Sequence, residues 1–326
     1  GAAPAGRGGA VLTALRILLA LTVLALVGVS IGAVASIWIP QLVLFQPFAA
    51  QVAVAALIAV ALGLLLGLRR WVLVPAAVAV WQTAMLLPFL WPGALWTASA
   101  APVTGAPLRV LSLNLWMANP EPQKTVDYLL NSGADVIGTA ETTPDWRQRL
   151  TALEAAYPYH VDCVYTVPGC GLTLFSKQPI EAFFVGRIRG GPPAVAWIRL
   201  NWEGKPLTVS ELQVLNPMIG LQRGLQARQA VNLIRYFSAF DGDMVVMGAF
   251  HSVPWGPLPR EFRAGTTLDN RGRLAFTWPS WAPAAFRLPI DQIFVAGALE
   301  ARNYHAGPAV GSDHLPVRAE IYRTSP

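Results

Sequence analysis

Polar residues of four types interrupt or end stretches of the chain that are otherwise apolar. Asn114 ends Val-Leu-Ser-Leu-Asn, Glu141 follows Val-Ile-Gly-Thr-Ala, and Asp291 lies within Leu-Pro-Ile-Asp-Gln-Ile-Phe-Val. Near the C-terminus, Asp313 and His314 belong to Gly-Ser-Asp-His-Leu-Pro. A buried sheet rarely holds such side chains unless they pair with one another or with a metal ion. The pattern therefore predicts a polar site at the ends of buried strands.

These side chains could bind a divalent cation and supply acid–base chemistry. Glu141 is a candidate ligand for Mg²⁺, Mn²⁺ or Ca²⁺, because hard cations prefer carboxylate oxygens. The alternative is that Glu141 caps a helix expected to begin near Thr143. His314 can hydrogen-bond or protonate a phosphoryl oxygen if a carboxylate orients it, and Asp291 is the expected partner. The alternative for His314 is a surface pair with Asp313.

In their order and spacing, these motifs resemble those of the endonuclease/exonuclease/phosphatase superfamily. Its members include DNase I-like nucleases, neutral sphingomyelinases and inositol phosphatases. The resemblance covers roughly residues 108–322. It implies a catalytic divalent cation at Glu141 with Asn114 beside it, and His314 paired with Asp291. It also implies that Asp313 approaches the metal ion or its water.

Several positions depart from the pattern of this superfamily. The Gly-Asp-Phe-Asn motif reads Gly-Ala-Phe-His here, so Ala249 replaces the Asp that orients the attacking water. In the same motif, His251 replaces an Asn that contacts phosphate. The Thr-His-Leu strand reads Ser-Glu-Leu, which puts Glu211 in place of a phosphate-contacting His. Gln292 stands where a His commonly follows the strand Asp.

Three accounts of Ala249 are open from the sequence. An engineered change could have inactivated an enzyme in order to trap its substrate. Alternatively, the chain is a natural variant in which Glu211 or His251 serves as the base. In the third account the chain is a pseudoenzyme that binds a ligand without cleaving it.

The elements that must position these residues fall in the C-terminal two thirds of the chain. Apolar stretches and helical patterns alternate irregularly there, which predicts two sheets packed together with helices outside. The expected fold class is an α/β (α+β) four-layer sandwich, preceded by N-terminal transmembrane helices. The expected strands are 109–116, 134–140, 157–164, 171–176, 195–201, 207–212, 243–250, 287–295 and 317–322, and the expected helices are 120–132, 143–156 and 221–237.

The first part of the chain is much more apolar than the rest. Residues 17–37, 48–68 and 71–90 form apolar runs, each of about the 20 residues that span a bilayer core. Between residues 11 and 101 the charged residues are three arginines. We therefore expect a membrane domain with three transmembrane helices (1–95), a linker (96–107) and a soluble domain (108–326).

The arginines also predict an orientation in the membrane. Arg7 and Arg16 precede the first run, Arg69 and Arg70 join the second and third, and the loop 38–51 carries no charge. Because positive residues remain on the cytoplasmic side, the soluble domain is expected outside a bacterial plasma membrane. The alternative is the inverted arrangement. In an external domain Cys163 and Cys170 can form a disulfide, and otherwise they are two buried thiols.

Together these features predict a divalent-metal-dependent phosphohydrolase that acts on a membrane lipid phosphate, phosphodiester or pyrophosphate. Among membrane-tethered members of the superfamily, the plan resembles bacterial teicoplanin-resistance membrane proteins, which implies a lipid-linked substrate of the cell envelope. One alternative is a lipid-binding pseudoenzyme. A nuclease is disfavoured, because the net charge of +6 comes without a dense basic segment, and we expect no nucleic-acid partner.

Overall fold

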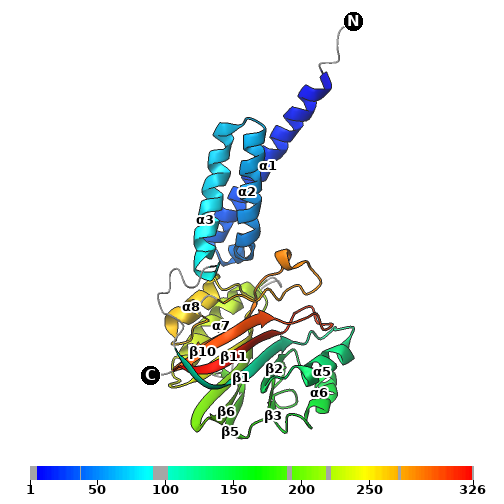
Figure 1. The fold of residues 1–326 in the computed structure, drawn as a ribbon, viewed down its shortest axis with the longest axis vertical. Coiled ribbons are helices and arrows are strands. Elements are labelled where there is room, and N and C mark those ends of the chain that lie inside the picture. The colour runs from blue at the N-terminus through cyan, green and yellow to red at the C-terminus, as the bar shows by residue number, and fades with distance from the viewer. Residues whose placement is uncertain are drawn as a thin grey trace. The chain divides into compact units, whose positions relative to one another are not determined.

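The computed structural model describes residues 6–36, 38–90, 102–188, 193–217, 222–270 and 273–324. The chain divides into two compact units, Gly1–Trp91 and Pro92–Pro326 (Figure 1). Each unit has hydrophobic clusters of its own, and each is described here by itself.

The first unit is helical. It contains α1 (Gly6–Ala35), α2 (Ala49–Leu65) and α3 (Leu73–Leu90), with the 3-10 helices η1 (Pro40–Phe48) and η2 (Arg69–Val72) between them. Three segments, 9–35, 41–65 and 69–89, are long and apolar enough to cross a membrane. The three apolar helices predicted from the sequence are thus confirmed.

The second unit contains two β-sheets. The strands of the first sheet are β1 (Val103–Asn114), β2 (Val136–Ala140), β3 (Tyr159–Asp162), β4 (Thr173–Ser176), β10 (Leu299–Ala306) and β11 (Val317–Thr324). The strands of the second are β5 (Ile180–Arg187), β6 (Ala194–Trp202), β7 (Lys205–Gln213), β8 (Met244–Ala249) and β9 (Asp291–Ala296). Their orders are β10-β11-β1-β2-β4-β3 and β5-β6-β7-β8-β9.

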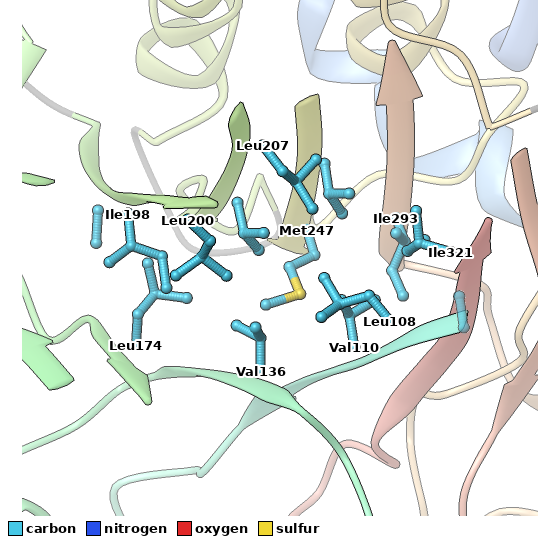
Figure 2. Packing of buried hydrophobic residues seen from close by; sticks show 14 of the residues in the cluster. Leu108, Val110, Val136, Leu174, Ile198, Leu200, Leu207, Met247, Ile293 and Ile321 are labelled. Carbon is cyan, nitrogen blue, oxygen red and sulfur yellow. The ribbon is translucent and has the colours of Figure 1, made fainter. Parts of the chain in front are cut away.

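The two sheets face each other across an apolar core. Val110 and Val136 from the first sheet meet Leu200, Met247 and Ile293 from the second (Figure 2). Since successive side chains of a strand point to opposite faces, every second residue of these strands enters the core. Polar residues that continue this alternation at a strand end therefore lie at the rim of the space between the sheets.

Helices cover the outer faces of both sheets. The helices α5 (Pro122–Asn131) and α6 (Pro144–Arg149) bury Leu129 and Trp146 against the first sheet. On the second sheet, α7 (Gln222–Phe237) and α8 (Pro257–Gly265) contribute Leu233 and Phe262 to a cluster with Phe294. The result is the predicted four-layer sandwich.

Several element bounds differ from the prediction. β1 begins at Val103, within the segment expected to be a linker. The helix expected over 143–156 is α6 followed by a 3-10 turn, η3 (Leu150–Leu153). The strands β5 and β10 and the helix α8 were not predicted. β10 is an edge strand with charged residues, and α8 is a helix of nine residues with prolines at its first and third positions.

Cys163 and Cys170 form a disulfide. It closes a short loop between β3 and β4, and it agrees with the first of the two alternatives stated for these cysteines. Both cysteines of the sequence are therefore used.

Candidate active site

The register of the sheets gathers the predicted site residues at one end of the sandwich. Asn114, the last residue of β1, pairs with Ala140 in parallel β2, and Glu141 follows directly. In the facing sheet, the last residue of β8, Ala249, pairs with Asp291, which begins antiparallel β9. The loop with His314 precedes β11, whose first residue pairs with β1 near the same end.

His314 and Asp291 form a buried pair. Nδ1 of His314 donates to Asp291, at 2.8 Å from Oδ2 and 3.0 Å from Oδ1. Thr277 Oγ1 donates to the same carboxylate. Burial lowers the pKa of His314, but the charge and hydrogen bond of Asp291 outweigh this effect, so the pKa is raised above its usual value. The structure therefore favours an imidazolium here.

His251 lies beside His314, but its surroundings shift its pKa in the opposite direction. The two ring centroids are 5.7 Å apart, with the planes at 81°. Nδ1 of His251 is 2.6 Å from the Val214 carbonyl oxygen and must donate to it, so in the neutral ring Nε2 is the unprotonated nitrogen. Burial and the neighbouring His314 lower the pKa of His251. Its φ of 46° is unusual for a residue other than glycine, and such strain is common at functional sites.

Glu141 points toward the same end of the sandwich and accepts three hydrogen bonds. Oε1 accepts from Asn114 Nδ2 at 2.9 Å and from Gln213 Nε2 at 3.0 Å. Oε2 accepts from the backbone N–H of Met117 at 3.1 Å. The helix cap is Thr143, whose hydroxyl accepts from the N–H of Trp146, so Glu141 does not serve as the cap.

The donor set around Glu141 fits a divalent cation with a single protein carboxylate. Among the described residues no group of three or more His, Cys, Asp or Glu side chains could hold a metal ion. Asn114 uses Oδ1 for the N–H of Trp116, and Asp313 Oδ2 accepts from Trp278 Nε1 at 3.2 Å. Mg²⁺ commonly binds one or two carboxylates and takes its other ligands from water and substrate phosphate, which this site allows.

Glu211 lies deeper between the two sheets than the other site residues. It is two residues before Gln213 on the same face of β7, is fully buried, and accepts from Ser112 Oγ at 2.8 Å. Its Oε2 has no hydrogen-bond partner among the described residues. Burial raises the pKa of Glu211 well above its usual value, which favours the neutral acid over the carboxylate.

Gln292 and Gln213 also lie in this region. Gln292 donates to the Ser252 carbonyl oxygen at 2.7 Å and accepts from Asn270 at 3.1 Å, which gives it a structural role. Gln213 contacts Glu141 but was not predicted. The signal available in the sequence was its place two residues after Glu211, on the same face of the strand.

Comparison with known proteins assigns the fold to a family. Residues 111–314 match the model of the Endonuclease/Exonuclease/phosphatase family. The chain belongs to this family. Its members are hydrolases that act on phosphoester bonds, and the predicted superfamily is confirmed. No curated protein matches the sequence.

Solved structures of this family share the fold at low sequence identity. Sphingomyelinase C from Streptomyces griseocarneus is 16% identical with a TM-score of 0.53, covering 66% of this chain and 99% of that one. A beta toxin mutant from Staphylococcus aureus with bound magnesium is 15% identical with a TM-score of 0.52, covering 66% and 99%. A family member from Bacteroides vulgatus is 16% identical with a TM-score of 0.54, covering 68% and 100%.

Proposed function

We propose that this protein is a phosphohydrolase that acts on a phosphate, phosphodiester or pyrophosphate group of a membrane lipid. The observation that carries the proposal is the pair of adjacent imidazoles, His251 and His314, at the end of the sandwich that also holds Glu141. Three helices able to cross a membrane support a lipid substrate, as does the likeness to sphingomyelinase C and beta toxin.

The two histidines supply an acid and a base with separate tasks. The unprotonated Nε2 of His251 takes a proton from a water molecule whose oxygen forms the new bond to phosphorus. His314, oriented by Asp291, stabilises the developing negative charge and donates a proton to the leaving oxygen as its bond to phosphorus breaks. Pairs of titratable groups whose pKa values are driven apart are typical of acid and base assignments.

Glu141 is the residue that would hold a divalent cation. Mg²⁺ is the first choice, with Mn²⁺ or Ca²⁺ as substitutes, and beta toxin, which shares the fold, was solved with bound magnesium. When bound, the cation would neutralise charge on the phosphoryl oxygens. Asn114 and Gln213 orient the Glu141 carboxylate through their amide groups. The proposal assigns no metal contact to Asp313, which is bonded to Trp278.

The proposal favours one of the three accounts of Ala249. A neutral His251 supplies the base that Ala249 lacks, whereas a protonated Glu211 does not. This supports a natural variant over a disabled enzyme or a pseudoenzyme. The disulfide and the uncharged loop 38–51 support placing the sandwich outside a bacterial plasma membrane, where a lipid-linked pyrophosphate of the cell envelope would be within reach.

Release of phosphate from a lipid panel tests the proposal. The panel contains phosphatidic acid and a polyprenyl pyrophosphate, which release inorganic phosphate, and sphingomyelin, a phosphodiester that releases phosphocholine and is scored by that product. Each lipid is tested with Mg²⁺ or with EDTA. We expect release that needs Mg²⁺ and that falls by about 10²–10⁴ in the variants His251→Ala and His314→Ala. Ala249→Asp is the matched gain-of-function control.

The outcomes separate the competing accounts. If only Ala249→Asp releases phosphate, the chain is a disabled hydrolase and His251 is not the base. If no form releases phosphate while the chain still binds a lipid of the panel, the pseudoenzyme account replaces the proposal.

A further inference from the structure

The loop before β9 exposes large apolar side chains to solvent. Trp281 is 81% exposed and Phe286 is 65% exposed. The loop, drawn in orange in Figure 1, is held in shape by Arg287, whose guanidinium donates to the carbonyl oxygens of Ala282 at 2.8 Å and Ser280 at 2.9 Å. Fixed local hydrogen bonds thus maintain a conformation in which both aromatic side chains remain outside the core.

The same loop is bonded to the candidate active site. The N–H of Ser280 donates to the Asp313 carbonyl oxygen at 2.7 Å. The Ser280 hydroxyl donates to the carbonyl oxygen of Ser312 at 2.6 Å. Trp278 Nε1 donates to the Asp313 carboxylate. Trp281 therefore directly follows a residue that is bonded to the segment carrying His314.

Two other loops, which contact Glu141 or Pro144, also expose apolar side chains. Met117 is 69% exposed, and its backbone N–H donates to Glu141. Tyr165 is 70% exposed, and its hydroxyl donates to the carbonyl oxygen of Pro144, three residues after Glu141. We refer to Met117, Tyr165, Trp281 and Phe286 together as the apolar rim.

The chemistry of the apolar rim matches a bilayer interface. Exposed clusters of large apolar groups mark interaction surfaces, and Trp and Tyr are enriched where membrane meets water. No acidic residue occurs between Thr277 and Ile290, so the loop suits a surface of lipid phosphates. The bilayer is also within reach, because residues 91–102, which join Leu90 to Val103, extend over at most about 43 Å.

We propose that the apolar rim inserts into the interfacial layer of the bilayer and brings the mouth of the site to the level of the lipid phosphates. The exposure of the four side chains and their position near the candidate site support this contact. Only the identity of the hydrolysed group rests on the proposed function.

A single fluorescent label tests the contact in the full-length chain. Both native cysteines form the disulfide, so Trp281→Cys introduces one thiol for an environment-sensitive fluorophore in lipid nanodiscs. Phe183→Cys is the matched control. Phe183 is also an exposed aromatic (62%), but it lies on β5, the edge of its sheet opposite β9. We expect the label at 281 to shift to the blue and lose most of its emission with nitroxide-bearing lipids, and the label at 183 to do neither.

Other results overturn the proposal. Equal behaviour of the two labels, or strong quenching of the 281 label by aqueous iodide, shows that the rim stays in water. A blue shift without quenching by nitroxide lipids shows that a protein, such as a second copy of the chain, covers the rim instead.

A second measurement connects the contact to turnover. In the double variant Trp281→Ser/Phe286→Ser, hydrolysis of nanodisc-borne lipid should fall, while hydrolysis of soluble bis(p-nitrophenyl) phosphate should remain unchanged. Equal losses on both substrates contradict the proposal. If the unmodified chain hydrolyses neither substrate, the proposed function fails, and the quenching result still decides the role of the rim.

Discussion

At the scale of single residues, His251 and His314 lie side by side, but their contacts shift their pKa values in opposite directions. Of the two, His314 donates from Nδ1 to the carboxylate of Asp291, whereas His251 donates from Nδ1 to a backbone carbonyl oxygen. Each imidazolium also disfavours a second one nearby, which lowers the pKa of His251 further. These contacts support the proposed roles of His251 as base and His314 as acid.

This assignment predicts a bell-shaped pH profile for phosphate release. Activity should be lost as pH falls through the pKa of His251, which lies below the usual value of 6.5, because the base becomes protonated. It should also be lost as pH rises through the pKa of His314, above 6.5, because the acid loses its proton. The residual activity of His251→Ala should lack the acidic limb. An unchanged acidic limb in that variant would falsify the role of His251.

Glu211 predicts a pH dependence of stability. Its pKa in the fold lies well above the value of 4.5 expected for the unfolded chain. Between these two values the folded state binds more protons, so the free energy of unfolding falls as pH rises, by up to about 1.4 kcal/mol per pH unit. Glu211→Gln, which keeps an acceptor for Ser112, should flatten this slope. Thermal midpoints at several pH values check the prediction, and equal slopes for both proteins would contradict it.

At the scale of elements, the parallel pair β7 and β8 depends on a glycine directly before Ala249. Gly248 has φ 142°, and a Cβ atom there would lie 1.9 Å from the carbonyl oxygen of Leu212. The two strands can therefore approach closely enough to bring Gln213 and Ala249 into register. This close approach holds one side of the candidate site in place.

Gly248→Ala should lower the free energy of unfolding by about 2–5 kcal/mol, because the added carbon collides with backbone and cannot be relieved by a side-chain movement. Gly204→Ala is the matched control. It also has a positive φ, 76°, but its Cβ would meet nothing within 4 Å. Chemical denaturation of both variants provides the measurement. Equal losses would show that backbone strain, rather than the collision, sets the cost.

The sequence predicted most of these elements, because strands such as β8 are continuous apolar runs and helices such as α5 have one apolar face. It also predicted that Asn114, Glu141, Asp291 and His314 would meet, since each ends or precedes a buried strand. It did not predict the contact of Gln213 with Glu141 or the deep position of Glu211. Both depend on the register between strands and on the spacing of two sheets, which local patterns do not encode.

At the scale of the whole molecule, the two units have separate hydrophobic clusters and should respond separately to mutation. In the first unit, Gln82 of α3 donates to Ser30 of α1 at 2.9 Å in a buried setting. Gln82→Leu should destabilise that unit by about 0.6–2 kcal/mol, the range measured for such bonds between membrane helices. Thermal unfolding in which the helical unit and the sandwich are followed separately should show a shift only in the transition of the helical unit. A shift of the sandwich transition would show that the units are energetically coupled.

The position of β11 has a consequence for how the protein is made. Among the described strands β11 is the last in sequence, yet it lies between β1 and β10, and Ser312 just before it donates to the backbone oxygen of Asn114. While the ribosome is still adding residues before Val317, β1 and β10 keep unpaired edges that invite aggregation. The nascent domain also lacks His314 until almost its whole length has been synthesised. The buried pair of His314 with Asp291 and the protection of these strand edges are thus completed together, once β11 has been synthesised.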